Sequence, residues 1–126
     1  QSLALVRALQ CLGVDWIDVS SGGVSPRQQL PLGPGYQVPL AEAIKREPGV
    51  TTITVGLITE PAQAEAIVAG GQADLVALAR GILYDARWPW HAAAALGATV
   101  MAPPPYWRSP PAEHKALFAG ASIGAR

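Results

Sequence analysis

Three short runs of apolar, largely β-branched residues alternate with helical patterns along this chain. The runs are Val14–Ser20, Thr51–Val55 and Asp74–Ala79, and each is predicted to form a strand. Near-continuous apolar strands that alternate with helices are typical of parallel sheets, so the pattern places the chain in the α/β class. Because three parallel strands cannot close a barrel, we interpret them as the last three strands of an eight-stranded one.

Helices are predicted around these strands from apolar spacing and from the positions of proline and glycine. They are expected at Gln1–Leu12, at about Pro39–Glu47, from the residue after Thr59 to Ala69 with Pro61 in the first turn, and at Ala86–Leu96. Thr59 and Asp85 are the expected N-caps of the last two helices. Cys11 falls on the apolar side of the first helix and is expected in the core.

Charge and cysteine content exclude several classes of partner and site. Nine Lys+Arg balance nine Asp+Glu, so neither nucleic acid nor an anionic membrane has a basic surface to bind. The single cysteine rules out an intrachain disulfide and is typical of a cytoplasmic protein. The most apolar late stretch is too short to span a bilayer. Half of the residues are hydrophobic, more than a self-contained unit of this size needs.

Small residues follow two of the predicted strands just before a helix, in Val55–Thr59 and in Leu78–Gly81. Small side chains let a ligand approach the backbone, and a helix start offers unpaired N–H groups to an anion. Successive turns of this kind build the phosphate site of many α/β barrels. Each glycine taken singly is explained as well by a tight turn. Arg80 favours phosphate, because a guanidinium is otherwise costly to place directly after an apolar strand.

The other polar residues give weaker signals. Ser20–Gly23 is expected to form a turn rather than a ligand site. Asp15 and Asp18 point to opposite faces of their strand and cannot act as a paired acid and base. His91 and His114 lack further ligands at metal-binding spacing, so no metal site is expected. No nucleophile with a base and no glycine-rich nucleotide motif occurs, and we expect no catalytic set within this chain.

The end of the chain has a different composition, and we divide the sequence into residues 1–97, part of a barrel domain, and residues 98–126, a proline-rich tail. Pro103–Pro105 is expected to form a stiff extended arm. It would present Tyr106, Trp107 and Arg108, residue types that anchor interfaces, to a partner subunit. The alternatives are a disordered tail, or Trp107 folding back on its own domain with Arg108 in solvent.

Five motifs in order resemble the C-terminal part of the Old Yellow Enzyme family. They are Asp18–Gly23 (DVSSGG), Pro34–Lys45 (PGYQVPLAEAIK), Val55–Thr59 (VGLIT), Gly70–Ala93 and Pro104–Arg108 (PPYWR). The similarity is greatest to the bacterial, thermophilic-like branch of FMN-dependent NADPH dehydrogenases and ene-reductases. It implies a (βα)8 TIM barrel to which this chain contributes strands six, seven and eight. The implied function is reduction of activated alkenes, such as enones, by hydride from reduced FMN.

The resemblance also assigns cofactor-binding residues. Gly56 and Leu57 match the positions after strand seven that hold the FMN phosphate, and Ala79 and Arg80 match the pair that closes strand eight. Many relatives have glycine where this chain has Ala79, so its backbone must adopt an ordinary conformation. Tyr106 and Arg108 match a terminal segment that reaches into the neighbouring subunit's active site.

The family's substrate-binding His pair and its proton-donating Tyr match nothing in this chain, so no catalytic residue is assigned here. Activity would belong to the complete barrel, with an N-terminal part or a second chain supplying the rest. NADPH or NADH would be the reductant, and a homodimer or homotetramer is expected. Two alternatives stay open: the phosphate-binding segment of a non-redox TIM barrel, or an inert half-barrel fragment.

Overall fold

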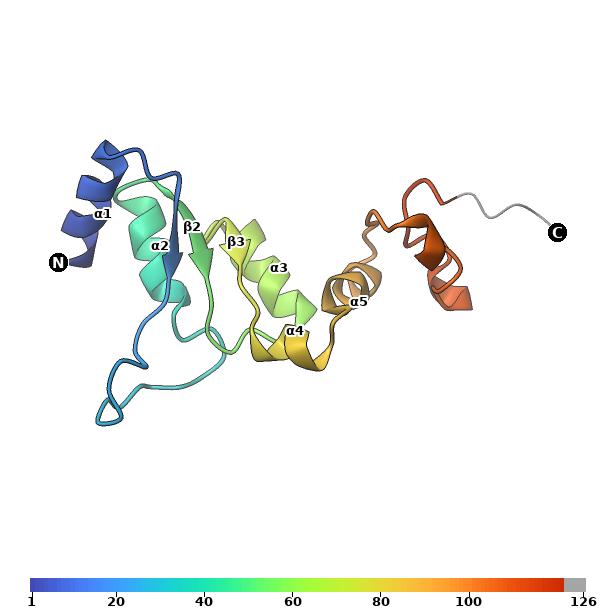
Figure 1. Ribbon diagram of the computed structural model, residues 1–126, viewed down its shortest axis with the longest axis horizontal. Coiled ribbons are helices and arrows are strands. Elements are labelled where there is room, and N and C mark those ends of the chain that lie inside the picture. The colour runs from blue at the N-terminus through green and yellow to red at the C-terminus, as the bar shows by residue number, and fades with distance from the viewer. Residues whose placement is uncertain (122–126) are drawn as a thin grey trace. The chain divides into compact units, whose positions relative to one another are not determined.

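The computed structural model describes residues 1–121 and divides the chain into two compact units (Figure 1). Unit 1 is Gln1–Gly81 and unit 2 is Ile82–Arg126. The boundary between these compact units differs from the functional division expected at residues 97 and 98, which stays a prediction. Each unit is described by itself.

Unit 1 is built on a three-stranded parallel sheet with the order β1-β2-β3. The strands are β1 (Trp16–Val19), β2 (Thr51–Thr54) and β3 (Leu75–Val76). Trp16 pairs with Thr51 at the start of the first ladder, and Ile53 pairs with Leu75 in the second. The predicted parallel α/β class is therefore confirmed.

Helices precede and follow each strand. Unit 1 contains α1 (Ser2–Cys11), α2 (Val38–Arg46) and α3 (Pro61–Ala69), and α4 (Arg80–Tyr84) begins at its end. Proline lies in the first turn of α2 and of α3, where its fixed φ favours a helix and its missing N–H is not needed. No helix in residues 1–121 is long and apolar enough to cross a membrane.

One face of the sheet packs against the helices. Thr52 and Thr54 on β2 are fully buried on that face, together with aliphatic side chains of α1, α2 and α3. Side chains alternate between the faces of a strand, so Trp16, Ile53 and Leu75 lie on the opposite face. There Trp16 is 59% exposed and Leu75 is 48% exposed. Within the described residues, the helices thus cover one face of the sheet and leave the other open.

An ion pair joins α2 to the start of β3. Lys45 Nζ lies 2.9 Å from Asp74 Oδ1, and Asp74 Oδ2 accepts a hydrogen bond from the Thr52 N–H at 2.9 Å. The Lys45 side chain, followed by the Thr52 N–H, lowers the pKa of Asp74 below its ordinary value. Asp74 therefore links three elements of unit 1 through a charged carboxylate.

The last predicted strand is shorter than expected. Only Leu75 and Val76 form β3, although the N–H groups of Asp74 and Ala77 still donate to carbonyls of β2 at 3.0 and 2.7 Å. Arg80 does not close a strand, because the chain turns there and Arg80 is the first residue of α4. The first two strands also lose residues at their ends and keep their predicted centres.

Two predicted N-caps are wrong. Glu60, not Thr59, precedes α3, because a residue before proline adopts the extended conformation seen at Glu60. The last long helix, α5 (Trp88–Ala95), begins after Arg87 rather than after Asp85. A start at Ala86 would have placed Pro89 where a helical N–H must donate.

Cys11 is exposed rather than in the core. Val6 is the buried residue of α1, and Cys11 lies five positions further along the helix. Five positions correspond to about 140° of rotation around a helix, so the two side chains occupy different faces. The prediction that Cys11 lies in the core, made from the apolar spacing of α1, is therefore wrong.

In unit 2, α5 packs with the segment that follows it. Buried Ala93, Leu117 and Phe118 form a small core, against which Trp90 and Trp107 are partly buried. The short 3-10 turns η1 (Pro104–Tyr106) and η2 (Ala112–His114) follow α5. An isolated parallel bridge joins Val100 to Phe118.

The predicted stiff arm is not seen in the proline run. Pro103 is extended, but Pro104 begins the 3-10 turn η1. Trp107 folds onto unit 2, where its Nε1–H donates to the Ala102 carbonyl at 2.9 Å. Packing of the aromatic side chains thus overrides the extended preference of the prolines. Residues 122–126 of the predicted tail lie outside the described residues.

Candidate functional site: a pocket at the carboxyl ends of the strands

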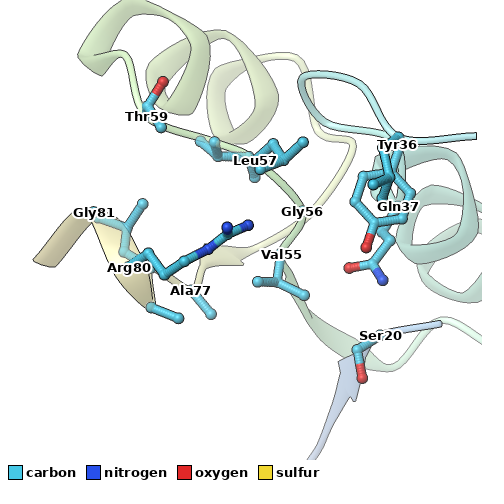
Figure 2. Close-up of a pocket in the computed structure, with 14 residues that line it drawn as sticks. Ser20, Tyr36, Gln37, Val55, Gly56, Leu57, Thr59, Ala77, Arg80 and Gly81 are labelled. Atoms are coloured by element: carbon cyan, nitrogen blue, oxygen red, sulfur yellow. The ribbon is translucent and has the colours of Figure 1, made fainter. Parts of the chain in front are cut away.

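A pocket of about 520 Å³ lies in unit 1 where the strands end. Ser20 after β1, Val55–Thr59 after β2 and Ala77–Gly81 after β3 line it, together with residues from the segment before α2 (Figure 2). Parallel strands bring their carboxyl ends to one edge of the sheet, which is where α/β folds bind ligands. The structure therefore places the four residues expected to bind phosphate, Gly56, Leu57, Ala79 and Arg80, around one cavity.

The turn after β2 requires a glycine. Gly56 has a φ of +115°, and a Cβ there would lie 3.0 Å from Cε1 of Tyr36. The Gly56 carbonyl also accepts a hydrogen bond from the Gly35 N–H at 2.7 Å. A side chain at Gly56 would therefore strain the backbone and push against the segment that forms the pocket wall.

Leu57 has an unusual backbone conformation. Its φ is +52°, and it is the one non-glycine residue in the described part of the chain with a positive φ. The left-handed conformation costs about 1–2 kcal/mol for a residue with a side chain. Strain of this kind collects at ligand sites, which makes this turn a candidate binding element.

The turn after β3 has an ordinary backbone, as the presence of alanine predicted. Ala79 does not have a positive φ. Gly81 is in open space, since a Cβ at this position would meet no atom within 4 Å. This second turn therefore depends less on glycine than the first turn does.

Arg80 supplies the charge of the pocket. Figure 2 shows its side chain extending from the start of α4 toward Gly56 and Leu57. The residues that line the pocket include no carboxylate, and the described residues give Arg80 no ion pair or hydrogen bond. An unpaired guanidinium with backbone turns on either side suits an anion, above all phosphate, which it can bind through two parallel hydrogen bonds.

Gln37 is a pocket residue that sequence reasoning missed. Its side chain is buried, and its Nε2 donates to the carbonyl of Ser21 at 2.8 Å. Its Oε1 has no partner in the described part of the chain and lies 3.2 Å from where a Cβ of Gly56 would be. Gln37 thus ties the end of β1 to the turn after β2. The signal in the sequence was a polar amide at the start of an apolar helix, within the PGYQ motif.

The other two predicted site residues, Tyr106 and Arg108, belong to unit 2. Tyr106 packs edge-on against Trp90, whereas Arg108 is exposed and has no partner among the described residues. No group of three or more His, Cys, Asp or Glu residues that could hold a metal occurs in residues 1–121. Within unit 1 the candidate site is a pocket lined by one cation, Arg80, and by no carboxylate, His or Cys.

A sequence-profile comparison shows the family to which this chain belongs. The sequence profile of the NADH:flavin oxidoreductase / NADH oxidase family matches residues 4–98. The chain therefore belongs to this family, and its resemblance to the C-terminal part of the Old Yellow Enzyme family is confirmed. An FMN phosphate fits the unpaired cation and the strained turn after β2, in a pocket free of carboxylates.

Curated relatives are named NADPH dehydrogenase. The protein of Geobacillus sp. (strain WCH70) is 53% identical over 96 residues, which cover 76% of this chain and 28% of that protein. Those of Geobacillus thermodenitrificans and Halalkalibacterium halodurans are 48% and 46% identical, over 82% and 85% of this chain and 30% and 31% of theirs. The chain thus spans less than a third of the length of these relatives. Their names and the family description agree with the expected flavin cofactor and NADPH.

Proposed function

We propose that this chain is the FMN-binding C-terminal portion of an Old Yellow Enzyme-type NAD(P)H:flavin oxidoreductase. It would supply strands six, seven and eight of a (βα)8 barrel. The open face of its sheet, with Trp16, Ile53 and Leu75, supports this placement. In a closed barrel that face turns inward and is covered by side chains of the other strands.

Unpaired Arg80 is the observation that carries the proposal. The backbone of Gly56, Leu57 and Ala79 would hold the FMN phosphate, and Arg80 would neutralise its charge. The left-handed conformation of Leu57 and the hydrogen bond from the Gly35 N–H to the Gly56 carbonyl would fix the shape of this site before the ligand arrives. A rigid site loses less conformational freedom on binding.

Bound FMN would supply hydride transfer from NADPH to the β-carbon of an activated alkene, whose α-carbon an acid would protonate. This chain would orient the cofactor by holding its phosphate. The pocket contributes no carboxylate, His or Cys that could serve as the acid. The acid and the carbonyl-binding groups would therefore come from the rest of the barrel.

The proposal includes partners. The remaining strands would come from a longer chain or a second chain, and the complete barrel would be a cytoplasmic homodimer or homotetramer. Tyr106 and Arg108 would contribute to a neighbouring subunit's site. NADH could replace NADPH as the reductant, and neither nucleic acid nor a membrane is proposed as a partner.

The test is the spectrum and activity of the complete barrel. We expect a yellow sample with flavin absorption that oxidises NADPH faster when an enone is present, with one saturated carbonyl formed for each NADPH consumed. A colourless sample that binds a sugar phosphate would replace the proposal with a non-redox phosphate-binding barrel. A complete barrel that binds neither ligand would overturn both interpretations.

A further inference from the structure

Arg87 makes an unusual contact in unit 2. Its guanidinium carbon lies 5.6 Å from the ring centroid of Trp90 and 5.4 Å from that of Tyr106. The two rings also meet edge-on, with their centroids 5.2 Å apart. One cation thus contacts two rings that are themselves in contact. The family match includes Arg87 and Trp90 but ends at residue 98, before Tyr106, and none of the three residues lines the phosphate pocket.

The contacts of Arg87 are set by its neighbours. Asp85 Oδ1 accepts a hydrogen bond from the Arg87 N–H at 3.0 Å, while Asp85 Oδ2 lies 2.6 Å from Nδ1 of His91. One carboxylate oxygen of Asp85 thus holds the backbone of Arg87, and the other contacts the His91 ring. The Arg87 guanidinium is left to the rings, on which its planar shape can stack.

Tyr106 begins a turn that carries Arg108. The Ser109 N–H donates to the Tyr106 carbonyl at 2.8 Å, which places Arg108 third in a four-residue turn. Trp107 is held on the same unit by the bond from its Nε1–H to the Ala102 carbonyl. Both residues before Arg108 are therefore anchored, and Arg108 itself is exposed without a partner in the described residues.

We propose that Arg87 is a positioning residue for Arg108. By holding Tyr106 against Trp90, its guanidinium fixes the turn from which Arg108 projects as a free cation. A cation presented from a fixed turn loses less conformational freedom when it meets an anionic or electron-rich group. This inference rests on the proposed function in one respect, namely that Arg108 acts on the flavin or substrate of a neighbouring subunit.

The first experiment measures the turn directly in the complete enzyme, without reference to activity. Trypsin cleaves after Arg108, and the rate of that cleavage reports how firmly the turn is held. Arg87→Ala is expected to accelerate it by roughly 2- to 5-fold for each aromatic ring that the guanidinium no longer holds. Arg87→Lys should have an intermediate effect, since it keeps a cation without the planar stack. Arg46→Ala removes an equal charge from an exposed site in unit 1 and serves as the control. A cleavage rate unchanged in Arg87→Ala would overturn the proposal.

The second experiment asks whether Arg87 acts through Arg108. In Arg87→Ala the KM for the alkene should rise in the same direction as in Arg108→Ala, by a smaller factor. The double variant should be no worse than Arg108→Ala alone. Additive losses would overturn the positioning role. If Arg108→Ala is kinetically normal, the proposed role of Arg108 at the neighbouring site is wrong, and the cleavage rates still decide whether Arg87 holds the turn. If Arg87→Ala does not fold, Arg87→Lys carries both experiments.

Discussion

Aliphatic side chains form the core of unit 1, whereas aromatic rings bring together the described part of unit 2. In unit 1 many aliphatic side chains contact one another, next to a continuous ladder of parallel strand pairing. In unit 2 one residue, Trp90, contacts Tyr106, Phe118 and the Arg87 guanidinium. The stability of unit 1 therefore depends on the contacts of many residues, and that of unit 2 depends on the contacts of a few.

Arg80 of unit 1 and Arg87 of unit 2 also differ in their surroundings. Arg80 extends into a pocket and has no partner among the described residues, whereas Arg87 contacts two rings. A free cation is available to a ligand, and a stacked one holds structure. The surroundings of each guanidinium, rather than the residue type, distinguish a binding role from a positioning role.

The largest effect is expected at the turn after β2. Gly56→Ala forces an L-residue into a φ of +115° and brings a Cβ within 3.0 Å of the Tyr36 ring. Backbone strain and overpacking each cost about 1–3 kcal/mol, so the free energy of unfolding of the complete barrel should fall by about 2–6 kcal/mol. Flavin retention should fall with it. Denaturant unfolding and the flavin absorbance after dialysis measure the two effects.

Two glycines provide matched controls for that variant. Gly71 has a φ of +73° and no atom within 4 Å of a Cβ, so Gly71→Ala tests backbone strain without the clash. Gly81 lines the pocket, with open space and no positive φ, and Gly81→Ala should be close to neutral. If Gly56→Ala lowers the free energy of unfolding no more than Gly71→Ala does, the expected clash with the Tyr36 ring is unimportant.

In unit 2 the aromatic contacts are tested by Trp90→Ala. Loss of the ring should destabilise this unit by about 2–4 kcal/mol, near the low end for a large aromatic because Trp90 is partly buried. Amide hydrogen exchange should accelerate at Val100 and Ala119, whose N–H groups donate to the Leu117 and Val100 carbonyls, while the strand amides of unit 1 keep their protection. Tyr84→Ala, which removes a ring that is 96% exposed, is the control. Equal acceleration in both units would contradict the division of the chain into separately held parts.

The elements of unit 1 were largely predictable, because periodicity and proline placement are local signals. The β2 and α3 elements lie within one residue of their expected bounds. The short β3 was not predictable, since an apolar run does not say where the backbone turns into the next helix.

The pocket was predictable in its residues and not in its geometry. Small residues before a helix pointed to Gly56 and Leu57, but the positive φ of Leu57 depends on its tertiary surroundings. Gln37 was missed because its role comes from contact with residues far away in the sequence. The fold of the tail was missed for a different reason: the proline run favoured an extended arm, whereas the Trp107 Nε1–H donates to the carbonyl of Ala102, five residues earlier.

A smaller effect is expected from the ion pair in unit 1. Because its Lys45 partner lowers the pKa of Asp74, the charged carboxylate stabilises the folded state above the ordinary value of 3.8. That stability is lost as the pH falls through the lower folded pKa. Asp74→Asn should cost about 1 kcal/mol at neutral pH, since the pair is partly exposed, and its deficit should shrink as the pH falls below about 4. Exposed Asp15→Asn is the control, and urea unfolding at several pH values measures both. A deficit for Asp74→Asn that is independent of pH would contradict the account.

The central claim, that Arg80 and the two turns hold the phosphate of FMN, is tested most directly by comparing two flavins. FMN and riboflavin share the ring and differ in the phosphate, so the ratio of their dissociation constants isolates the phosphate contact. A charge-assisted hydrogen bond contributes about 1.5–3 kcal/mol, which corresponds to roughly 10- to 150-fold in affinity. In the complete barrel we predict that Arg80→Ala weakens FMN binding by such a factor and leaves riboflavin binding unchanged, so that the preference for FMN shrinks. An unchanged preference for FMN in Arg80→Ala would contradict the claim.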